Sequence, residues 1–326
     1  MSLDQQIDRL IKPLAEGLSD IVFYQISVFG QGFPLIVLWL VTAAVFFTGY
    51  LGFINIRGFS KAISLVSGTS GKTNGSGEIS HFQALSTAIS GTVGVGNIGG
   101  VAVAISIGGP GAAFWLFMAG FLGMSTKFVE CTLGVKYRRE NLDGSVSGGP
   151  MYYLERYLLD RGFPKLGKLL GGFYALALVI GCFGIGNMFQ SNQAYVQVLS
   201  ISGGENSFFA DKGWLFGLLL ASAVAAVIIG GIRSIGNVAS KIVPFMAGIY
   251  ILASLIIIFA NIKYVGDAFG MIFSGAFTPE AGLGGVLGVL IVGFQRASFS
   301  NEAGAGSAAI AHSAVKTDEP ISEGFV

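Results

Sequence analysis

Two glycine-rich segments, each embedded in a long hydrophobic stretch, hold the residues best suited to bind a ligand. Residues 92–100 read TVGVGNIGG, and residues 295–307 read QRASFSNEAGAGS. A helix that breaks at glycines exposes amide groups at the start of the next helix. These amides, with the partial positive charge at that helix end, can hold an anion such as a carboxylate. The carbonyl groups freed before such a break suit a hard cation such as sodium.

The first segment allows three interpretations. We predict a local unwinding in which the carbonyls of Thr92 and Val93, with the amide oxygen of Asn97, form a sodium site. The glycines could instead serve close helix packing, because two of them have GxxxG spacing. The segment also matches the dinucleotide-binding pattern GxGxxG, but that motif follows a strand and needs an acidic residue about 20 positions further on. Here the preceding residues are typical of a helix and the next acidic residue is Glu130, so we reject nucleotide binding.

The second segment combines side-chain oxygens, glycines and two charges. Ser300 and Asn301 supply oxygens. Arg296 and Glu302 are charged residues inside a hydrophobic stretch, where such residues are functional candidates. Two interpretations stay open for them. In the structural one, Arg296 reaches toward the membrane interface and Glu302 caps a half-helix. In the functional one, Glu302 binds a proton or a cation directly.

Further polar residues lie in two other hydrophobic stretches. Asn187 and Gln190 have the spacing of one helix face, and the amide of Gln190, which both donates and accepts, suits a zwitterion. Hydrogen bonding between helices is the competing interpretation. Lys127 and Glu130 are three residues apart, so they can pair on one helix face. No set of residues resembles a nucleophile with its base and acid, so we do not expect an enzyme.

The elements that carry these residues are hydrophobic helices. Of the 326 residues, 52% are hydrophobic and 11% are charged, and the mean hydropathy is +0.71. Since soluble domains carry roughly 25% charge, this composition predicts an all-α membrane protein whose solvent is a lipid bilayer. A formal net charge of +1 argues against nucleic acid as a partner.

We predict seven membrane spans, because each needs about 20 apolar residues. They cover residues 33–53, 82–108, 111–134, 169–196, 215–231, 242–260 and 283–314. The second and the last contain the two glycine-rich segments, and these two spans should run in opposite directions. Paired breaks at matching positions of two inverted repeats are typical of the binding site of a secondary transporter.

The distribution of basic residues predicts the orientation. Thirteen Lys and Arg residues fall in loops 54–80, 135–168 and 232–241 and after the last span, and four fall on the other side. Because cytoplasmic loops carry the excess of such residues, the N-terminus should lie outside the cell inner (plasma) membrane. Residues 1–32 are predicted to be an amphipathic segment, either along the membrane interface or in solvent, and residues 33–326 a transmembrane transporter domain.

The chain resembles the alanine or glycine:cation symporter family, the sodium–alanine symporters, over nearly its whole length. The stretches that carry the resemblance are GTVGVGNI from residue 91, GGPG from 108, GGPMYY from 148, GNMFQSN from 186 and FSNEAG from 299. The resemblance implies the LeuT-type architecture, a bundle of two inverted five-helix repeats. Since the chain stops at Val326, we predict that the bundle is truncated after the first helix of the second repeat.

The resemblance also implies roles for individual residues. The amides of Val95 and Gly96 would meet the substrate carboxylate, Thr92 and Asn97 would belong to a sodium site, and Gln190 would line the substrate pocket. Together with the interpretations above, this predicts two overlapping sets. The substrate set is Thr92, Gly94, Val95, Gly96, Gln190, Ser300 and Asn301, and the metal set is Thr92, Val93 and Asn97.

The function predicted from the sequence is sodium-coupled symport of a small neutral amino acid, alanine or glycine, by alternating access. Sodium would be the coupling ion. Two alternatives stay open. One is a proton-coupled transporter that uses Glu302 as the proton carrier, and the other is a membrane fragment that does not transport.

Overall fold

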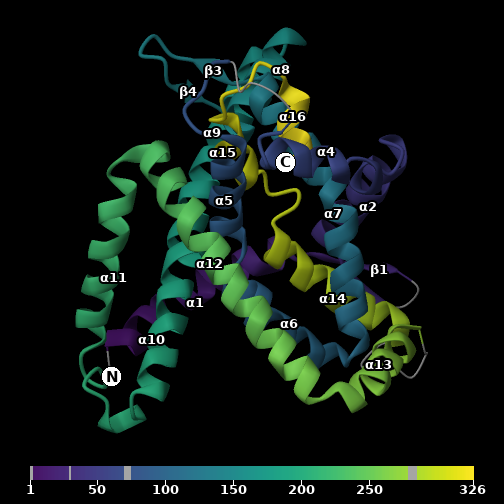
Figure 1. Ribbon diagram of the computed structural model, residues 1–326, viewed down its shortest axis with the longest axis vertical. Helices are drawn as coiled ribbons and strands as arrows, with labels where there is room; N and C mark the ends of the chain where they lie inside the picture. Colours follow the sequence, from purple (N-terminus) through teal and green to yellow (C-terminus); the bar gives the residue numbers. More distant parts are fainter. Residues whose placement is uncertain (1–2, 29–30, 70–74, 278–284) are drawn as a thin grey trace.

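The computed structural model describes residues 3–28, 31–69, 75–277 and 285–326 and is largely helical (Figure 1). Helices α1 to α4 cover Leu3–Val22, Leu35–Tyr50, Ile54–Arg57 and Phe59–Val66. The first broken span is α5 (His81–Thr92) with α6 (Val95–Gly108), and the second is α14 (Gly285–Asn301) with α15 (Ser307–Ser313). The predicted all-α class fits the described residues, whose few strands form two short hairpins.

Long apolar helices form the middle of the chain. These are α7 (Gly111–Lys136), α9 (Pro164–Gly181), the π-helix η1 (Cys182–Phe189), α10 (Gln190–Ile201), α11 (Gly213–Ile228) and α12 (Gly231–Ala260). Shorter elements are the hairpin β3 (Arg139–Glu140) and β4 (Val146–Ser147), the helices α8 (Pro150–Asp160), α13 (Val265–Phe277) and α16 (Pro320–Phe325), and the 3₁₀ turns η2 (Gly204–Asn206) and η3 (Ile262–Tyr264).

Every predicted span contains an apolar helix. Among the described residues, three helices are long and apolar enough to cross a membrane, namely α7, the joined run Pro164–Ile201 and α12. The pair α5 and α6 gives a fourth if it is counted as one bent span. The remaining predicted spans hold the shorter apolar helices Leu35–Tyr50, Gly213–Ile228 and Val286–Ser298.

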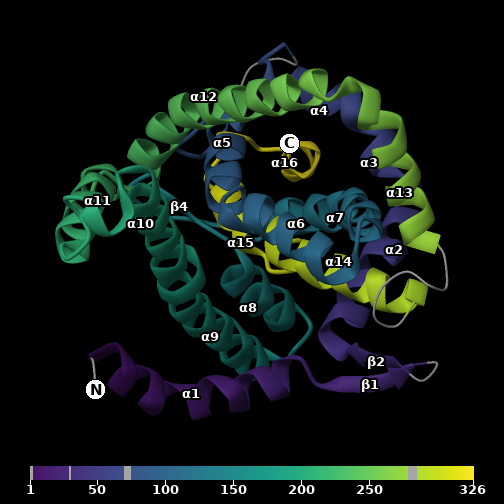
Figure 2. The same cartoon turned by 90° about the horizontal axis from the view of Figure 1, so that it is seen from below.

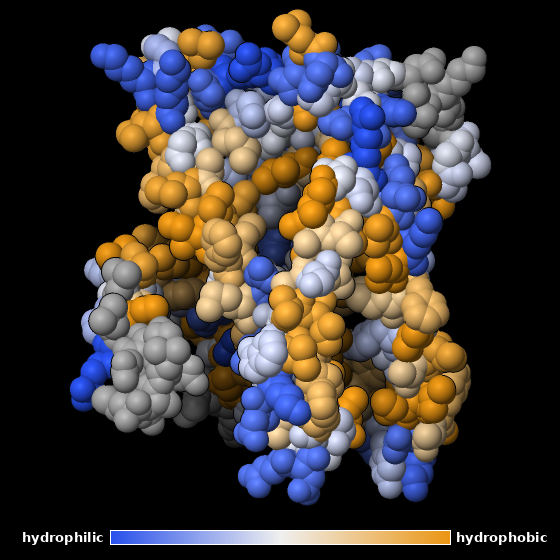
Figure 3. Space-filling model, turned by 90° about the vertical axis from the view of Figure 1, so that its left-hand side faces the viewer, coloured by the Kyte–Doolittle hydropathy of each residue, from blue (hydrophilic) through white to orange (hydrophobic). Residues whose placement is uncertain are grey.

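The outer helices expose apolar side chains, as expected of surfaces that face lipid. In α12, the exposed side chains include Phe245, Ile249, Leu252, Ile256 and Phe259. Protein buries only 6% of the most apolar window of α12, and the same is true of the run Pro164–Ile201. Figure 3 shows one flank on which apolar residues fill most of the middle and hydrophilic residues gather toward the two ends. This pattern supports a membrane-embedded protein.

Helix α7 lies at the centre of the bundle. It packs against α2, α6, α13, α14, α15 and α16, and Figure 2 shows α6, α7 and α14 in the middle with α12 curving around them. Small residues allow these close contacts. At the start of α7, for example, a Cβ on Gly111 would lie 2.2 Å from the carbonyl oxygen of Gly275 in α13, so only glycine fits there.

Several elements differ from the sequence prediction. Helices α3 and α4 form within the predicted loop 54–80, and α12 already covers the predicted loop 232–241. Helix α1 forms within the predicted amphipathic segment, and its apolar Ile11 and Leu18 are exposed. An antiparallel hairpin follows, β1 (Gln25–Val28) with β2 (Gln31–Pro34), which the sequence analysis missed. Helix α13 forms between the predicted spans 242–260 and 283–314, where no helix was expected. It packs on α7 and α14, and its Phe273 and Phe277 contact Phe114 of α7.

The basic loops meet at one end of the bundle, at the top of Figure 1. Arg138 is buried there and donates to the carbonyl oxygens of Ser313 (2.9 Å), Val315 (2.7 Å) and Thr317 (2.7 Å). Its guanidinium thus joins the end of α7 to the segment between α15 and α16. Arg233 pairs with Glu78 at 3.1 Å, which adds the start of α12 to the same end.

Glu323 of α16 is fully buried between two histidines at this end. It accepts hydrogen bonds from the Nδ1 atoms of His81, the first residue of α5, and His312, near the end of α15 (2.6 Å). Burial by itself raises the pKa of the Glu323 carboxyl, but the bonds from His312 and His81 outweigh it, so the pKa lies below its ordinary value of 4.5. Glu323 thereby connects α16 to α5 and to α15, which are one half-helix from each broken span.

We predict that Glu323→Gln lowers the unfolding free energy by about 2 kcal/mol near neutral pH, because it removes an ionised acceptor from two buried donors. Since the folded pKa is depressed, the contribution of Glu323 is present above pH 4.5 and is lost as the pH falls through the lower folded value. Thermal unfolding at a series of pH values should therefore show a gap between wild type and variant that closes in acid. The exposed Glu319→Gln is the control, and a gap that is independent of pH contradicts the assignment.

Candidate functional site

The first predicted break is confirmed. Helix α5 ends at Thr92 and α6 begins at Val95, and the two axes differ by 44°. Val93 and Gly94 between them are not helical, with φ and ψ of −88° and 105° at Val93 and −154° and −148° at Gly94. The last carbonyls of a helix have no partner within it, so the break presents carbonyl groups before it and amide groups after it.

The second predicted break is also confirmed. Helix α14 ends at Asn301, and three of the next residues adopt positive φ angles before α15 starts at Ser307: Glu302 (51°), Gly304 (96°) and Gly306 (80°). Two of these are glycines, which tolerate the left-handed conformation, but Glu302 does so at a cost of about 1 kcal/mol. Contacts from other helices must hold this break open.

Asn97 joins the two breaks. Its Oδ1 accepts from the amide of Gly94, the residue that caps the start of α6, at 3.1 Å, and its Nδ2 donates to the carbonyl of Ser300 at 3.2 Å, in the last turn of α14. Around this link α14 packs against α6 and α15 packs against α5. Figure 1 shows the same arrangement, with α6 and α14 in the lower part of the bundle and α5 and α15 in the upper part. The two spans therefore cross the bundle in opposite directions with their breaks side by side.

Gln190 reaches the first break from the neighbouring long helix. Its Oε1 accepts from the amide of Val95 at 3.2 Å, and a Cβ on Gly94 would lie 3.0 Å from the same oxygen. Gln190 follows directly on the π-helix η1. Such a π-helical insertion shifts the following residues around the helix axis and is frequent at functional sites. The sequence analysis did not foresee η1, although it predicted Gln190 as a site residue.

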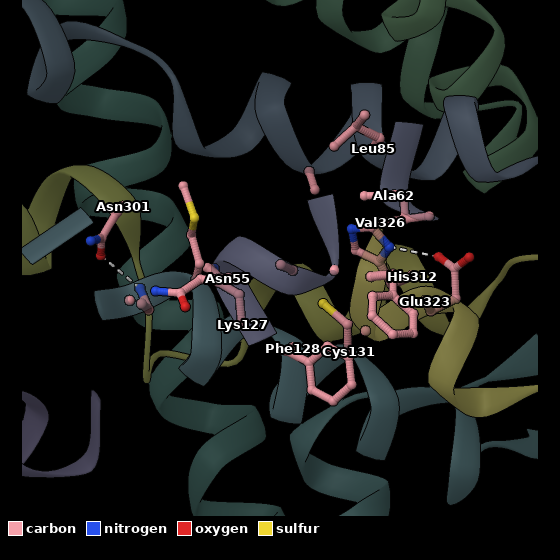
Figure 4. Close-up of a pocket in the computed structure, with 18 of the residues that line it drawn as sticks. Asn55, Ala62, Leu85, Lys127, Phe128, Cys131, Asn301, His312, Glu323 and Val326 are labelled. Atoms are coloured by element: carbon pink, nitrogen blue, oxygen red, sulfur yellow. Dashed lines mark hydrogen bonds and ion pairs between the residues drawn. The ribbon is translucent and has the colours of Figure 1, made fainter. Parts of the chain in front are cut away.

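A cavity of about 420 Å³ extends from the two breaks toward α16 (Figure 4). Thr92, Val93 and Asn301 line its inner part, and Glu323 lines the part near α16. Figure 4 shows Asn301 at one side of the cavity and the pair His312 and Glu323 at the other.

The predicted site residues fall into two groups. Thr92, Val93 and Asn301 line the cavity, and the Asn301 side chain accepts from the amide of Ala303 at 2.9 Å. The second group lies where the two breaks meet. Hydrogen bonds link Gly94 and Ser300 to Asn97 and link Val95 to Gln190, and Gly96 is buried. This group is Gly94, Val95, Gly96, Asn97, Gln190 and Ser300.

Other polar candidates have different environments. The hydroxyl of Ser191 donates to its own helix at Asn187 (2.9 Å), and the Asn187 side chain is exposed. Arg296 is half-buried and forms no ion pair with Glu302 among the described residues. The carboxylate of Glu302 accepts from the hydroxyl of Ser307, the first residue of α15.

Two side chains that the sequence analysis did not connect with the site hold the second break. The predicted pairing of Lys127 with Glu130 is present, with 3.9 Å between Nζ and Oε2, but Glu130 also accepts from the amide of Gly304 at 2.5 Å. Tyr174 of α9 donates to the carbonyl of Ala305 at 2.8 Å. The charge of Glu130 inside a span was a usable signal, whereas nothing in the sequence marked Tyr174.

The paired, oppositely directed breaks are typical of a secondary transporter. Residues 17–326 match the model of the sodium:alanine symporter family, and the chain belongs to this family. It is 46% identical over 294 residues to the sodium/alanine symporter AgcS of Methanococcus maripaludis. Two Bacillus subtilis proteins are also similar, at 40% identity to YrbD, a putative sodium/proton-dependent alanine carrier, and 34% to GlnT, a probable sodium/glutamine symporter.

The chain spans about three fifths of the length of AgcS. The match covers 90% of this chain and 63% of AgcS, 78% and 50% with YrbD, and 90% and 58% with GlnT. The family is one of symporters, which agrees with the expectation that the chain is not an enzyme.

We predict that Asn97→Ala lowers the unfolding free energy by about 1–2 kcal/mol, because it leaves the Gly94 amide and the Ser300 carbonyl without their partner. The melting temperature of the purified protein in detergent measures the effect. Asn187→Ala, which removes an exposed amide from another apolar helix, is the matched control. Equal melting temperatures for the two variants would show that the link between the breaks is not stabilising.

Proposed function

We propose that this chain forms the site of a sodium-coupled symporter for a small neutral amino acid, alanine or glycine, in a LeuT-type architecture. The observation that carries the proposal is the side chain of Asn97, which bonds both to the first break and to the last turn of α14. Because both breaks share one residue, an ion or a substrate that binds at one of them acts on the other. This sharing provides the coupling free energy that symport requires.

The substrate carboxylate would bind the amides at the start of α6. Gln190 Oε1 accepts from the Val95 amide at 3.2 Å, and a carboxylate oxygen is a stronger acceptor for the same donor. We infer that the carboxylate displaces Gln190 from Val95 and extends to the Gly96 amide. The side-chain amide of Gln190, once released, can turn its Nε2 toward the bound carboxylate.

The sodium ion would lie on the other side of the same break. Thr92 and Val93 precede α6 and line the cavity, and carbonyl groups beyond the last turn of a helix suit this ion. Asn97 Oδ1 already accepts one bond from Gly94, and its second lone pair is available for the ion. Sodium and substrate would then both order the residues around Gly94.

In this proposal α5 to α12 supply the first repeat and α14 with α15 supply the first helix of the second. The end of the bundle where the basic loops meet would face the cytoplasm of a cell whose inner (plasma) membrane holds the protein, with the N-terminus outside. Residues 1–32 would lie along the membrane interface, where the exposed Ile11 and Leu18 of α1 could enter the lipid. Residues 33–326 would form the transmembrane transporter domain.

Uptake of labelled alanine and glycine by proteoliposomes containing the complete protein tests the proposal. We expect uptake that depends on a sodium gradient and falls to background when choline replaces sodium. Amino-acid uptake that is unchanged in choline would rule out sodium coupling, and no uptake of either amino acid would rule out the substrate class.

We predict that Gln190→Glu raises the KM for alanine by about 100-fold, since it places a negative charge beside the proposed carboxylate site while keeping the size and the acceptor oxygen of Gln190. Gln193→Glu is the matched control, because Gln193 lies on the same helix and bonds to Asn192. A KM that rises equally in both variants would place the carboxylate elsewhere.

Proton coupling is the second candidate, because the similar protein YrbD is described as sodium/proton-dependent. The carboxylate of Glu302 lies within the second break and bonds to Ser307, so it is the group to test. Uptake by Glu302→Gln that keeps the sodium dependence and the pH profile of the wild type would exclude Glu302 as a proton carrier.

A further inference from the structure

Three side chains from three different helices hold successive backbone groups around the second break. Asn97 of α6 donates to the carbonyl of Ser300, Glu130 of α7 accepts from the amide of Gly304, and Tyr174 of α9 donates to the carbonyl of Ala305. In a bilayer, backbone groups outside a helix need such partners. Of the three side chains, only Glu130 is acidic, and it is also buried.

Stability alone does not explain the charges on α7. Lys127 Nζ and Glu130 Oε2 are 3.9 Å apart, too far for a hydrogen bond, and neither atom has a hydrogen-bond partner among the described residues. A buried ion pair with poor geometry seldom recovers the cost of desolvating two charges, and apolar residues of similar size are often as stable or better.

The well-made contact of Glu130 is the one to the break. Its Oε1 accepts from the Gly304 amide at 2.5 Å, which gives this backbone group a partner inside the bundle. Gly304 has a φ of 96°, and a Cβ there would lie 2.3 Å from Leu40 of α2, so the backbone at this point is closely confined. Two further charges among the described residues lie near Glu130, namely Lys127, which pairs with it, and Glu302, which bonds to Ser307.

We propose that Glu130 is a positioning residue of the transporter. Its bond to the Gly304 amide sets the backbone of the second break in the conformation that binds substrate, and Lys127 is its charge partner. Glu130 acts through Asn301 and Ser300 and does not touch the substrate. This inference rests on the proposed function, because it assigns Glu130 a part in substrate affinity.

Two double variants, both uncharged at positions 127 and 130, separate the effect of the hydrogen bond to Gly304 from the effects of charge and of side-chain packing. Lys127→Met with Glu130→Gln removes both charges and keeps an acceptor oxygen for Gly304. Lys127→Met with Glu130→Leu removes both charges and leaves the Gly304 amide without an acceptor. Both pairs nearly conserve the side-chain volume, so they differ mainly in this one hydrogen bond.

Sodium-driven alanine uptake by the complete protein in proteoliposomes, normalised to the amount of folded protein, is the measurement. We expect the Leu pair to raise the KM for alanine and the sodium concentration for half-maximal uptake by about tenfold relative to the Gln pair. The Gln pair should stay within about threefold of the wild type, because the neutral bond replaces much of the original. A merely structural role would lower the yield of folded protein and would leave both affinities unchanged.

Equal affinities in the two pairs overturn the proposal, whether both match the wild type or both are impaired. If the Leu pair does not fold, Glu130→Asp replaces it, because aspartate keeps the charge beside Lys127 but is one methylene too short to reach Gly304. An unchanged KM in Glu130→Asp then overturns the proposal. Sodium-dependent uptake by the wild type, with equal affinities in the variants, rejects this inference while leaving the proposed function intact.

Discussion

The need to satisfy backbone groups inside a bilayer explains most of the site. Where α5 and α14 end, the last carbonyls and the amides of the next segment have no helical partner, and lipid offers none. Side chains from other helices supply the missing partners: Asn97, Gln190, Glu130 and Tyr174. Each break is therefore stable only in the folded bundle, and its conformation depends on where neighbouring helices lie.

This dependence makes the breaks suitable as a binding site. A ligand can replace a side chain as the hydrogen-bond partner of a backbone group. Only that side chain must move, so helix packing need not change much. In the proposed function, the bond between Gln190 and the Val95 amide is of this kind. The strained Glu302, at a φ of 51°, shows that the second break is held against its local preference, so small changes in its partners can shift its conformation.

The end of the bundle near α16 is constrained differently. There, charged and polar side chains form dense buried networks around Arg138 and Glu323, which join α5, α7, α15 and α16. The cavity extends from the breaks to His312 and Glu323. Movement of α16 away from α5 and α15 would have to break the bonds of Glu323 to His81 and His312.

The sequence by itself determined the helical class, the approximate limits of the apolar helices and the position of both breaks. These features follow from local composition, because runs of apolar residues and clusters of glycine act within a few residues. It also predicted the pairing of Lys127 with Glu130, which lie on adjacent turns of one helix.

Only the tertiary structure decided which side chain meets which backbone group. The partners are 95 residues apart for Gln190 and Val95, 203 for Asn97 and Ser300, and 174 for Glu130 and Gly304. Such contacts depend on how helices pack, as do the hairpin β1–β2, the π-helix η1 and helix α13, and no local pattern encodes them.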